Sequence, residues 1–184
     1  MDETKLKLKN QPKKNREKET KLNVYCRHLE GTLNLSDFSD LKELDYRNLL
    51  TNLTLTNDLT NLKHLDLSSN NFSAEQNLSF LVGATSLEYL YLGIYNRFTG
   101  SLDYLNEMEK LRELNISNTD INEVDINKLP KSLESIEYSI ELRPSCKLTT
   151  IVPQLEKYGK YGRCKKCQQP NTSKNRCQPC VDEE

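Results

Sequence analysis

The sequence predicts an α/β solenoid followed by a small cysteine-rich module, and three observations lead to this fold class. A pattern of leucines recurs five times between residues 41 and 138, with successive starts 21 to 25 residues apart. In two of the copies an asparagine follows the first leucine at a similar offset, eight residues after Leu62 and nine after Leu87. Four of the six cysteines lie within the last 21 residues.

The clearest copy of the leucine pattern is Leu62-Lys-His-Leu65-Asp-Leu67, followed by Asn70 and Phe72. Other copies begin at Leu41, Leu87, Leu111 and Leu133. The pattern matches L-x-x-L-x-L-x-x-N, the signature of leucine-rich repeats of roughly 20–29 residues. Each short run also fits one turn of an amphipathic helix, but the regular spacing favours repeats. The predicted fold class is therefore an α/β leucine-rich-repeat solenoid.

Each repeat is expected to begin with a short strand whose leucines point inward and whose intervening residues point outward. Successive strands would stack in parallel on the concave face, with short helices or turns on the convex side. Asn70 and Asn96 are expected to satisfy backbone groups where the chain leaves the strand. Ser73-Ala-Glu-Gln76 resembles a capping box that opens a helix toward Leu81, and Ser101 is a second candidate cap for a helix through Met108.

The open ends of a repeat array need caps. We expect the segment 24–38 to cover the N-terminal end and a helix within 148–158 to cover the last repeat, starting near Pro153. Cys26 and Cys146 are expected to be packing residues, because nothing in their sequence surroundings indicates an activated thiol.

Charge divides the chain into three predicted parts. Residues 1–21 form a disordered basic arm, residues 22–158 the repeat domain with its caps, and residues 159–184 a zinc module and tail. The first 24 residues contain eight Lys or Arg against four Asp or Glu, whereas residues 25–156 contain 11 against 20. The predicted repeat domain is therefore acidic, and the segments before and after it are basic.

The outward strand positions are the candidate binding residues on the concave face. They combine acidic side chains with a central pair of tyrosines, which provide rigid contact area and one hydroxyl each. We expect an unidentified protein partner, with a basic segment as one possibility. The alternative is that the acidic residues only keep the face soluble. The candidate residues are Glu43, Asp45, His64, Asp66, Tyr89, Tyr91, Glu113, Asn115 and Glu137.

The sequence contains no motif of a hydrolase, P-loop nucleotidase, zinc protease or protein kinase. We therefore predict that the chain is not an enzyme and has no small-molecule substrate. No apolar stretch is long enough to span a membrane, and no signal peptide is recognisable. The expected location is the cytoplasm, with the nucleus as the alternative.

The cysteines Cys164, Cys167, Cys177 and Cys180 form two C-x-x-C pairs separated by nine residues. Two such pairs facing each other supply four thiolates in the tetrahedral geometry that Zn²⁺ prefers in structural sites. Two disulfides would need an oxidising compartment, and a redox dithiol would need a preceding hydrophobic strand. The predicted cofactor is one structural Zn²⁺ ion, without which this segment has too few apolar residues to fold.

Several segments resemble leucine-rich-repeat proteins of arbuscular mycorrhizal fungi, namely NVYCRHLEGTLNLSDFSDLKELD, LGIYNRFTGSLDYL, LNISNTDI and LPKSLESIEY. The tail YGRCKKCQQPNTSKNRCQPC resembles the cysteine-rich segment that precedes many protein-kinase domains of those fungi. The resemblance implies an intracellular interaction protein with a link to signalling. No kinase domain is present in this sequence, so kinase activity does not carry over.

The tail also resembles the zinc finger named for the Ran-binding nucleoporin, C-x₂-C-x₃-N-x₆-C-x₂-C, with Asn171 in the asparagine position. It departs from that finger in two places. The second gap has five residues, and Gly162 stands where the family has Trp. This resemblance implies the alternative function, binding of RNA or ubiquitin through the basic zinc finger.

Overall fold

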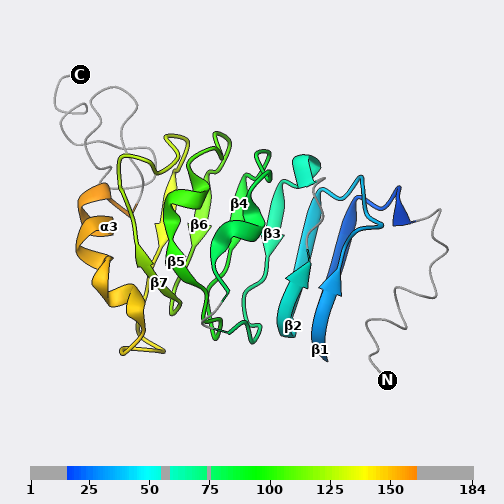
Figure 1. Ribbon diagram of the computed structural model, residues 1–184, viewed down its shortest axis with the longest axis horizontal. Helices are drawn as coiled ribbons and strands as arrows, with labels where there is room; N and C mark the ends of the chain where they lie inside the picture. Colours follow the sequence, from blue (N-terminus) through cyan, green and yellow to red (C-terminus); the bar gives the residue numbers. More distant parts are fainter. Residues whose placement is uncertain (1–15, 55–58, 74–75, 161–184) are drawn as a thin grey trace, which may run out of the picture.

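The computed structural model describes residues 16–54, 59–73 and 76–160, and its main feature is a parallel sheet (Figure 1). In these ranges six strands pair in the order β1-β2-β3-β4-β6-β8. Each neighbouring pair is parallel, so all strands of the main sheet run in the same direction and the chain crosses back before each new strand. The strands are β1 (Lys21–Asn34), β2 (Glu43–Thr54), β3 (His64–Asp66), β4 (Tyr89–Tyr91), β6 (Glu113–Asn115) and β8 (Ser135–Glu137).

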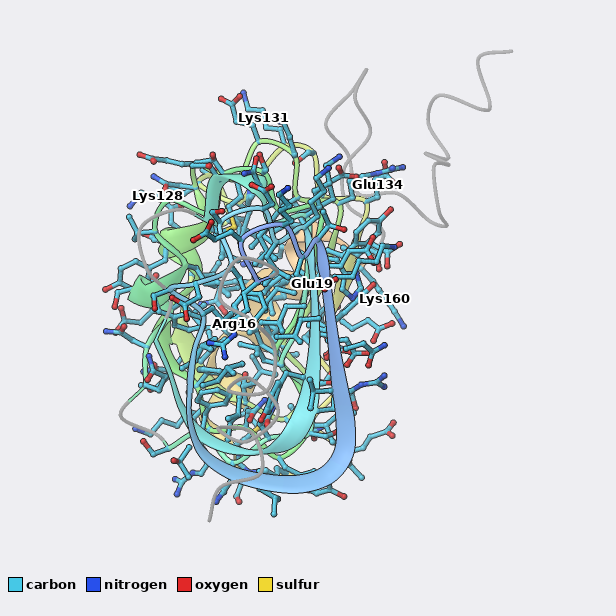
Figure 2. The ribbon with its side chains drawn as sticks, turned by 90° about the vertical axis from the view of Figure 1, so that its right-hand side faces the viewer. Arg16, Glu19, Lys128, Lys131, Glu134 and Lys160 are labelled. Carbon is cyan, nitrogen blue, oxygen red and sulfur yellow. The ribbon has the colours of Figure 1, made fainter. Side chains whose placement is uncertain are left out.

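Shorter elements form a second layer behind this main sheet. Strands β5 (Thr99–Ser101) and β7 (Asp120–Glu123) make a two-stranded parallel sheet. Four 3₁₀ helices occupy the described return segments. The end-on view separates this layer from the main strands (Figure 2). The helices are η1 (Leu59–Asn61), η2 (Leu78–Leu81), η3 (Leu102–Leu105) and η4 (Lys147–Thr150).

The core between the layers is the predicted ladder of inward aliphatic side chains. Leu44, Leu65, Leu90, Leu114 and Ile136 pair in register across five strands, and each is at most 1% exposed. Full burial of one such side chain contributes about 1.5–3 kcal/mol. The alternation of buried and partly exposed residues in each strand confirms the prediction of inward leucines.

The first two strands are longer than the sequence pattern predicts. Strand β1 has 14 residues and β2 has 12, whereas the later strands of the main sheet have three. Register shifts between Tyr25 and Glu30 and between Gly31 and Thr32 bend this pair. Irregularities of this kind turn a strand sharply, and Figure 2 shows both ribbons curving from the main sheet toward the second layer.

The predicted helix starts in the return segments were half right. Ser101 caps η3 by accepting a hydrogen bond from the Asp103 backbone N–H at 3.0 Å, although the helix ends at Leu105 and not at Met108. The capping box at Ser73 was wrong, because η2 begins at Leu78 and its cap is Asn77. Leu78 and Leu81, one 3₁₀ turn apart, are both buried in the core.

Both ends of the array are covered within the described residues. The segment predicted as the N-terminal cap forms most of β1, which lies at the edge of the main sheet. At the other end, α3 (Val152–Tyr158) has Pro153 in its first turn and buries Leu155 and Tyr158, as predicted. Arg16, which belongs to the predicted basic arm of residues 1–21, contacts Asp37 at 3.0 Å. No helix in the described ranges has the length and apolar character to cross a membrane.

Buried amides follow two of the strands, as the sequence pattern predicts. The Asn70 side chain donates to the Leu67 carbonyl at 2.8 Å and accepts from the Leu50 N–H at 3.0 Å. Asn96 donates to the carbonyls of Leu67 and Leu92 at 2.7 and 2.8 Å. Both side chains are at most 2% exposed, so they connect consecutive turns of the solenoid inside the core.

Candidate functional site

The outward side chains of the main sheet form two rows that we call the open face. All nine side chains predicted for the concave face lie in these rows, and each is at least partly exposed. Their alignment follows from parallel pairing in register, which places equivalent positions of consecutive repeats side by side. The first row contains Glu43, His64, Tyr89 and Glu113, and the second contains Asp45, Asp66, Tyr91, Asn115 and Glu137.

An aromatic cluster occupies the middle of the open face. The His64 ring lies 5.8 Å from that of Tyr89 and 5.5 Å from that of Tyr91, the latter edge to face. The Tyr91 hydroxyl donates to the Glu113 carboxylate at 2.9 Å. Burial of the ring, followed by this hydrogen bond, raises the pKa of the Tyr91 phenol well above its usual range. Tyr91 is therefore a fixed, neutral contact residue beside a carboxylate.

The β2 end of the open face already binds a guanidinium group. Arg47 donates to both carboxylate oxygens of Asp45 at 2.8 Å and lies 3.5 Å from Asp66. Asp66 also accepts a hydrogen bond from the Ser68 N–H at 2.8 Å. This paired arrangement is one that the sequence pattern did not predict. It shows that the carboxylates of the second row are spaced to accept an arginine.

At the other end of the open face, Asn115 donates to Glu137 at 2.7 Å and accepts from the Ser117 N–H at 2.9 Å. Gly93 makes room for this amide. A Cβ atom on Gly93 would lie 2.5 Å from the Asn115 side-chain oxygen, which is too close for any contact. The glycine in the third repeat therefore positions a polar residue of the fourth.

Ion pairs line the edge of the sheet where the strands begin. Lys63 contacts Glu88 at 3.1 Å, and Arg112 contacts Glu134 at 3.0 Å. In the end-on view, Glu134 and Lys160 project on the side of the main strands, whereas Lys128 projects on the side of the second layer (Figure 2). These exposed pairs contribute little stability. They add charges of both signs along this edge, whereas the rows of the open face carry mainly carboxylates.

The predicted zinc ligands Cys164, Cys167, Cys177 and Cys180 lie outside the described residues, so the structure does not test them. Cys146 is 1% exposed and packs in the core, as expected. The side chain of Cys26 is not described. Within the described ranges, no three His, Cys, Asp or Glu side chains gather in a way that could hold a metal ion.

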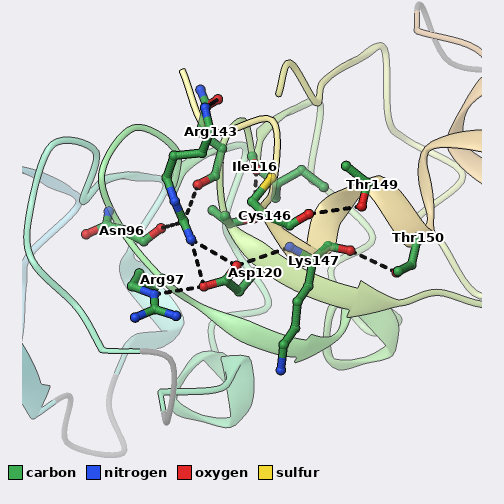
Figure 3. A network of polar contacts seen from close by, with 11 residues as sticks. Asn96, Arg97, Ile116, Asp120, Arg143, Cys146, Lys147, Thr149 and Thr150 are labelled. Carbon is green, nitrogen blue, oxygen red and sulfur yellow. Dashed lines mark hydrogen bonds and ion pairs between the residues drawn. The ribbon is translucent and has the colours of Figure 1, made fainter. Parts of the chain in front are cut away.

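A buried carboxylate with two arginines is the polar site that sequence reasoning missed (Figure 3). Asp120 is 2% exposed, and both of its carboxylate oxygens accept from one Arg143 nitrogen, Nη2, at 3.0 Å. The Arg97 Nε–H donates to Asp120 at 3.0 Å and the Lys147 backbone N–H at 3.1 Å. Burial alone would raise the pKa of Asp120, but these donors together lower it below its usual range. Arg97 and Arg143 each lie 23 residues from Asp120, a repeat-length spacing that was a usable signal.

Comparison with solved structures relates this architecture to known proteins. The leucine-rich-repeat ectodomain of the receptor kinase SOBIR1 from Arabidopsis thaliana matches with a TM-score of 0.54 and 26% sequence identity, covering 64% of this chain and 67% of that one. The chain has the leucine-rich-repeat fold. An internalin (inlF) from Listeria monocytogenes also matches, with a TM-score of 0.44 and 17% identity over 62% of this chain and 34% of the internalin. No protein-family model and no curated protein matches the leucine-rich-repeat chain.

Proposed function

We propose that this leucine-rich-repeat chain is a non-enzymatic interaction module that binds a partner protein through the open face. The supporting observation is the pair of side-chain rows, in which a tyrosine cluster lies between carboxylates at both ends. Curved or flat repeat sheets of this kind offer a continuous surface to a partner. Buried aromatic side chains with one polar atom are the groups that dominate protein interfaces.

The partner segment that fits this face is basic. Asp45 and Asp66 already accept the Arg47 guanidinium, and the same rows continue to Glu113 and Glu137. An exposed ion pair contributes only about 0.2–1 kcal/mol. Affinity must therefore come mainly from covering Tyr89 and Tyr91, while the carboxylates select a basic sequence and speed its association.

The experiment compares affinity purifications with three full-length baits: wild type, Tyr91→Ala and Tyr95→Ala. Loss of a central aromatic anchor costs about 2 kcal/mol or more, roughly a thirtyfold loss of affinity. We expect Tyr91→Ala to lose the partner. Tyr95→Ala is the matched control, because Tyr95 lies in the turn after β4, is 65% exposed and belongs to neither row of the open face. Equal recovery of the same proteins by the wild type and Tyr91→Ala would reject the open face as the binding surface.

We also propose that the four C-terminal cysteines hold one structural Zn²⁺ ion in a reducing compartment, the cytoplasm or nucleus. The support is their C-x₂-C-x₉-C-x₂-C spacing and the surrounding Lys165, Lys166, Lys174 and Arg176, which would offset the charge of four thiolates. Native mass spectrometry of the whole chain should show one bound zinc that is lost on chelation. Proteolysis should then cut faster only beyond residue 160. An unchanged mass and digest after chelation would contradict the proposal.

Under this proposal the zinc module is not the binding element. The alternative function, binding of RNA or ubiquitin through that module, predicts a different result. RNA bound through this basic module would dissociate steeply with rising salt. Binding to a protein through Tyr91 would depend on salt much less. The resemblance to fungal repeat proteins with kinase domains supports a role in signalling, in which the chain supplies recognition and another protein the phosphoryl transfer.

A further inference from the structure

A second surface lies behind the main sheet, where the return segments leave a groove. One hollow of about 490 Å³ lies between η2 and η3. A neighbouring hollow of about 380 Å³ extends to β7 and η4 and shares Ser101, Asp103 and Glu123 with the first. We call the two together the rear groove. Its lining comes from four consecutive turns of the solenoid and includes none of the open-face residues.

The first hollow has an apolar wall. Val82 is 67% exposed and Tyr104 is 37% exposed, while Leu81 and Met108 in the same lining are buried. Val82 follows η2 directly, and its N–H donates to the Ser79 carbonyl, so the side chain is held on a fixed backbone. An exposed valine beside a tyrosine in a concavity provides contact area for an apolar side chain of a ligand.

The charge of the rear groove has one sign. Its lining contains the carboxylates Asp103, Glu107, Glu123 and Asp125, and no Lys or Arg. Asp103 is paired with Lys128 at 2.8 Å, which lies outside the lining. Glu107 and Glu123 are exposed, and in the described part of the chain neither makes an ion pair. These two carboxylates disfavour phosphate-bearing ligands such as nucleic acids and acidic lipids, and favour a cationic ligand.

We propose that the rear groove binds an extended basic segment of a partner protein. One aliphatic side chain of that segment packs against Val82 and Tyr104, and its Lys or Arg residues approach Glu107 and Glu123. Four solenoid turns spaced by about 4.8 Å span roughly 15 Å, which is the length of about five extended residues. This proposal is independent of the open face, because the two surfaces share no residue.

The test uses fluorescence anisotropy with the full chain and a labelled nine-residue peptide that alternates Lys and Leu. Two further probes alternate Lys with Ser and Glu with Leu. We expect only the Lys–Leu probe to bind. Glu107→Lys or Glu123→Lys should weaken it by about two- to fivefold, the range of one exposed charge contact. Val82→Ser should weaken it as well, because the apolar contact is lost.

Controls separate this surface from the open face and from other occupants. Glu137→Lys reverses a carboxylate of the open face, so a loss of probe binding in this variant measures the probe bound at that face and not in the rear groove. Since all four substituted side chains are exposed, circular dichroism should confirm that the variants fold alike. Probe binding that responds to Glu137→Lys but not to Glu107→Lys or Glu123→Lys would overturn the assignment.

The chain's own N-terminal segment is a second possible occupant, because the sequence contains Lys-Leu-Lys-Leu-Lys at residues 5–9. Binding that appears only after Lys5, Lys7 and Lys9 are replaced by Glu would assign the groove to the chain itself and reject an external partner.

Discussion

Replacing Asp120 by Ala is expected to lower the free energy of unfolding by about 3 kcal/mol, the range for breaking a buried ion pair by removing one partner. The carboxylate is 2% exposed, and its loss leaves Arg143 half-buried without its two 3.0 Å contacts. Arg143 also donates to the carbonyls of Asn96 at 3.3 Å and Asn118 at 2.7 Å. The network therefore connects three turns of the solenoid, and the measurement is urea unfolding of the full chain.

Glu134→Ala is the matched control for this experiment. Arg112 also contacts both oxygens of Glu134, at 3.0 and 3.1 Å, but that pair is exposed and should contribute far less. If Glu134→Ala and Asp120→Ala destabilise the chain equally, burial of the Asp120 network is not the source of its effect.

The Asp120 network also predicts a dependence on pH. Because the folded state lowers the pKa of Asp120, its contribution is complete above the unfolded pKa of about 3.9 and is lost as the pH falls through the lower folded value. The difference in unfolding free energy between the wild type and Asp120→Asn should be constant near neutral pH and shrink below about pH 4. A difference that stays constant to lower pH would contradict the assigned direction of the pKa shift.

The repeat pattern predicted the main sheet because its physical cause is local. A leucine at every second position can bury only one face of a strand, so the positions of Leu44, Leu65 and Leu90 fixed both the strands and their register. The same alternation predicted all nine residues of the open face. What the pattern could not supply were contacts between repeats, such as Tyr91 with Glu113 or Arg47 with Asp66.

The return segments were harder to predict because their form depends on the neighbouring turns. The pairing of β5 with β7 joins residues about 20 positions apart, and neither strand has an alternating pattern of its own. The capping box at Ser73 satisfied a local rule for a helix start. Packing of Leu78 and Leu81 into the core selected a later start, so the tertiary contacts decided the local structure.

The sequence predicted that Asn70 and Asn96 satisfy backbone groups, but not that the two amides share one of them. Asn70 and Asn96 both donate to the Leu67 carbonyl, at 2.8 and 2.7 Å, so one backbone oxygen accepts from two buried amides. In the next repeat the equivalent position is Thr119, whose hydroxyl donates only to the Ile116 carbonyl at 2.7 Å. A threonine can therefore keep the contact within its own repeat but not the one that reaches to the repeat before it.

Replacing Asn96 by Ala should lower the free energy of unfolding by about 3 kcal/mol, because a buried backbone group left without its partner costs about 1–3 kcal/mol. The Leu92 carbonyl would lose its 2.8 Å donor and the Phe72 N–H its 3.4 Å acceptor, while the Leu67 carbonyl would keep Asn70. Asn96→Thr should cost less, since Thr119 shows that a hydroxyl can donate to a carbonyl of its own repeat.

Asn70→Ala combined with Asn96→Ala should lower the free energy of unfolding by more than the sum of the two single changes, because only the double variant removes both amide donors from the Leu67 carbonyl. Urea unfolding of the wild type, the two single alanine variants and the double variant measures this coupling. Strictly additive values would mean that water or a backbone shift satisfies the Leu67 carbonyl in place of the amides.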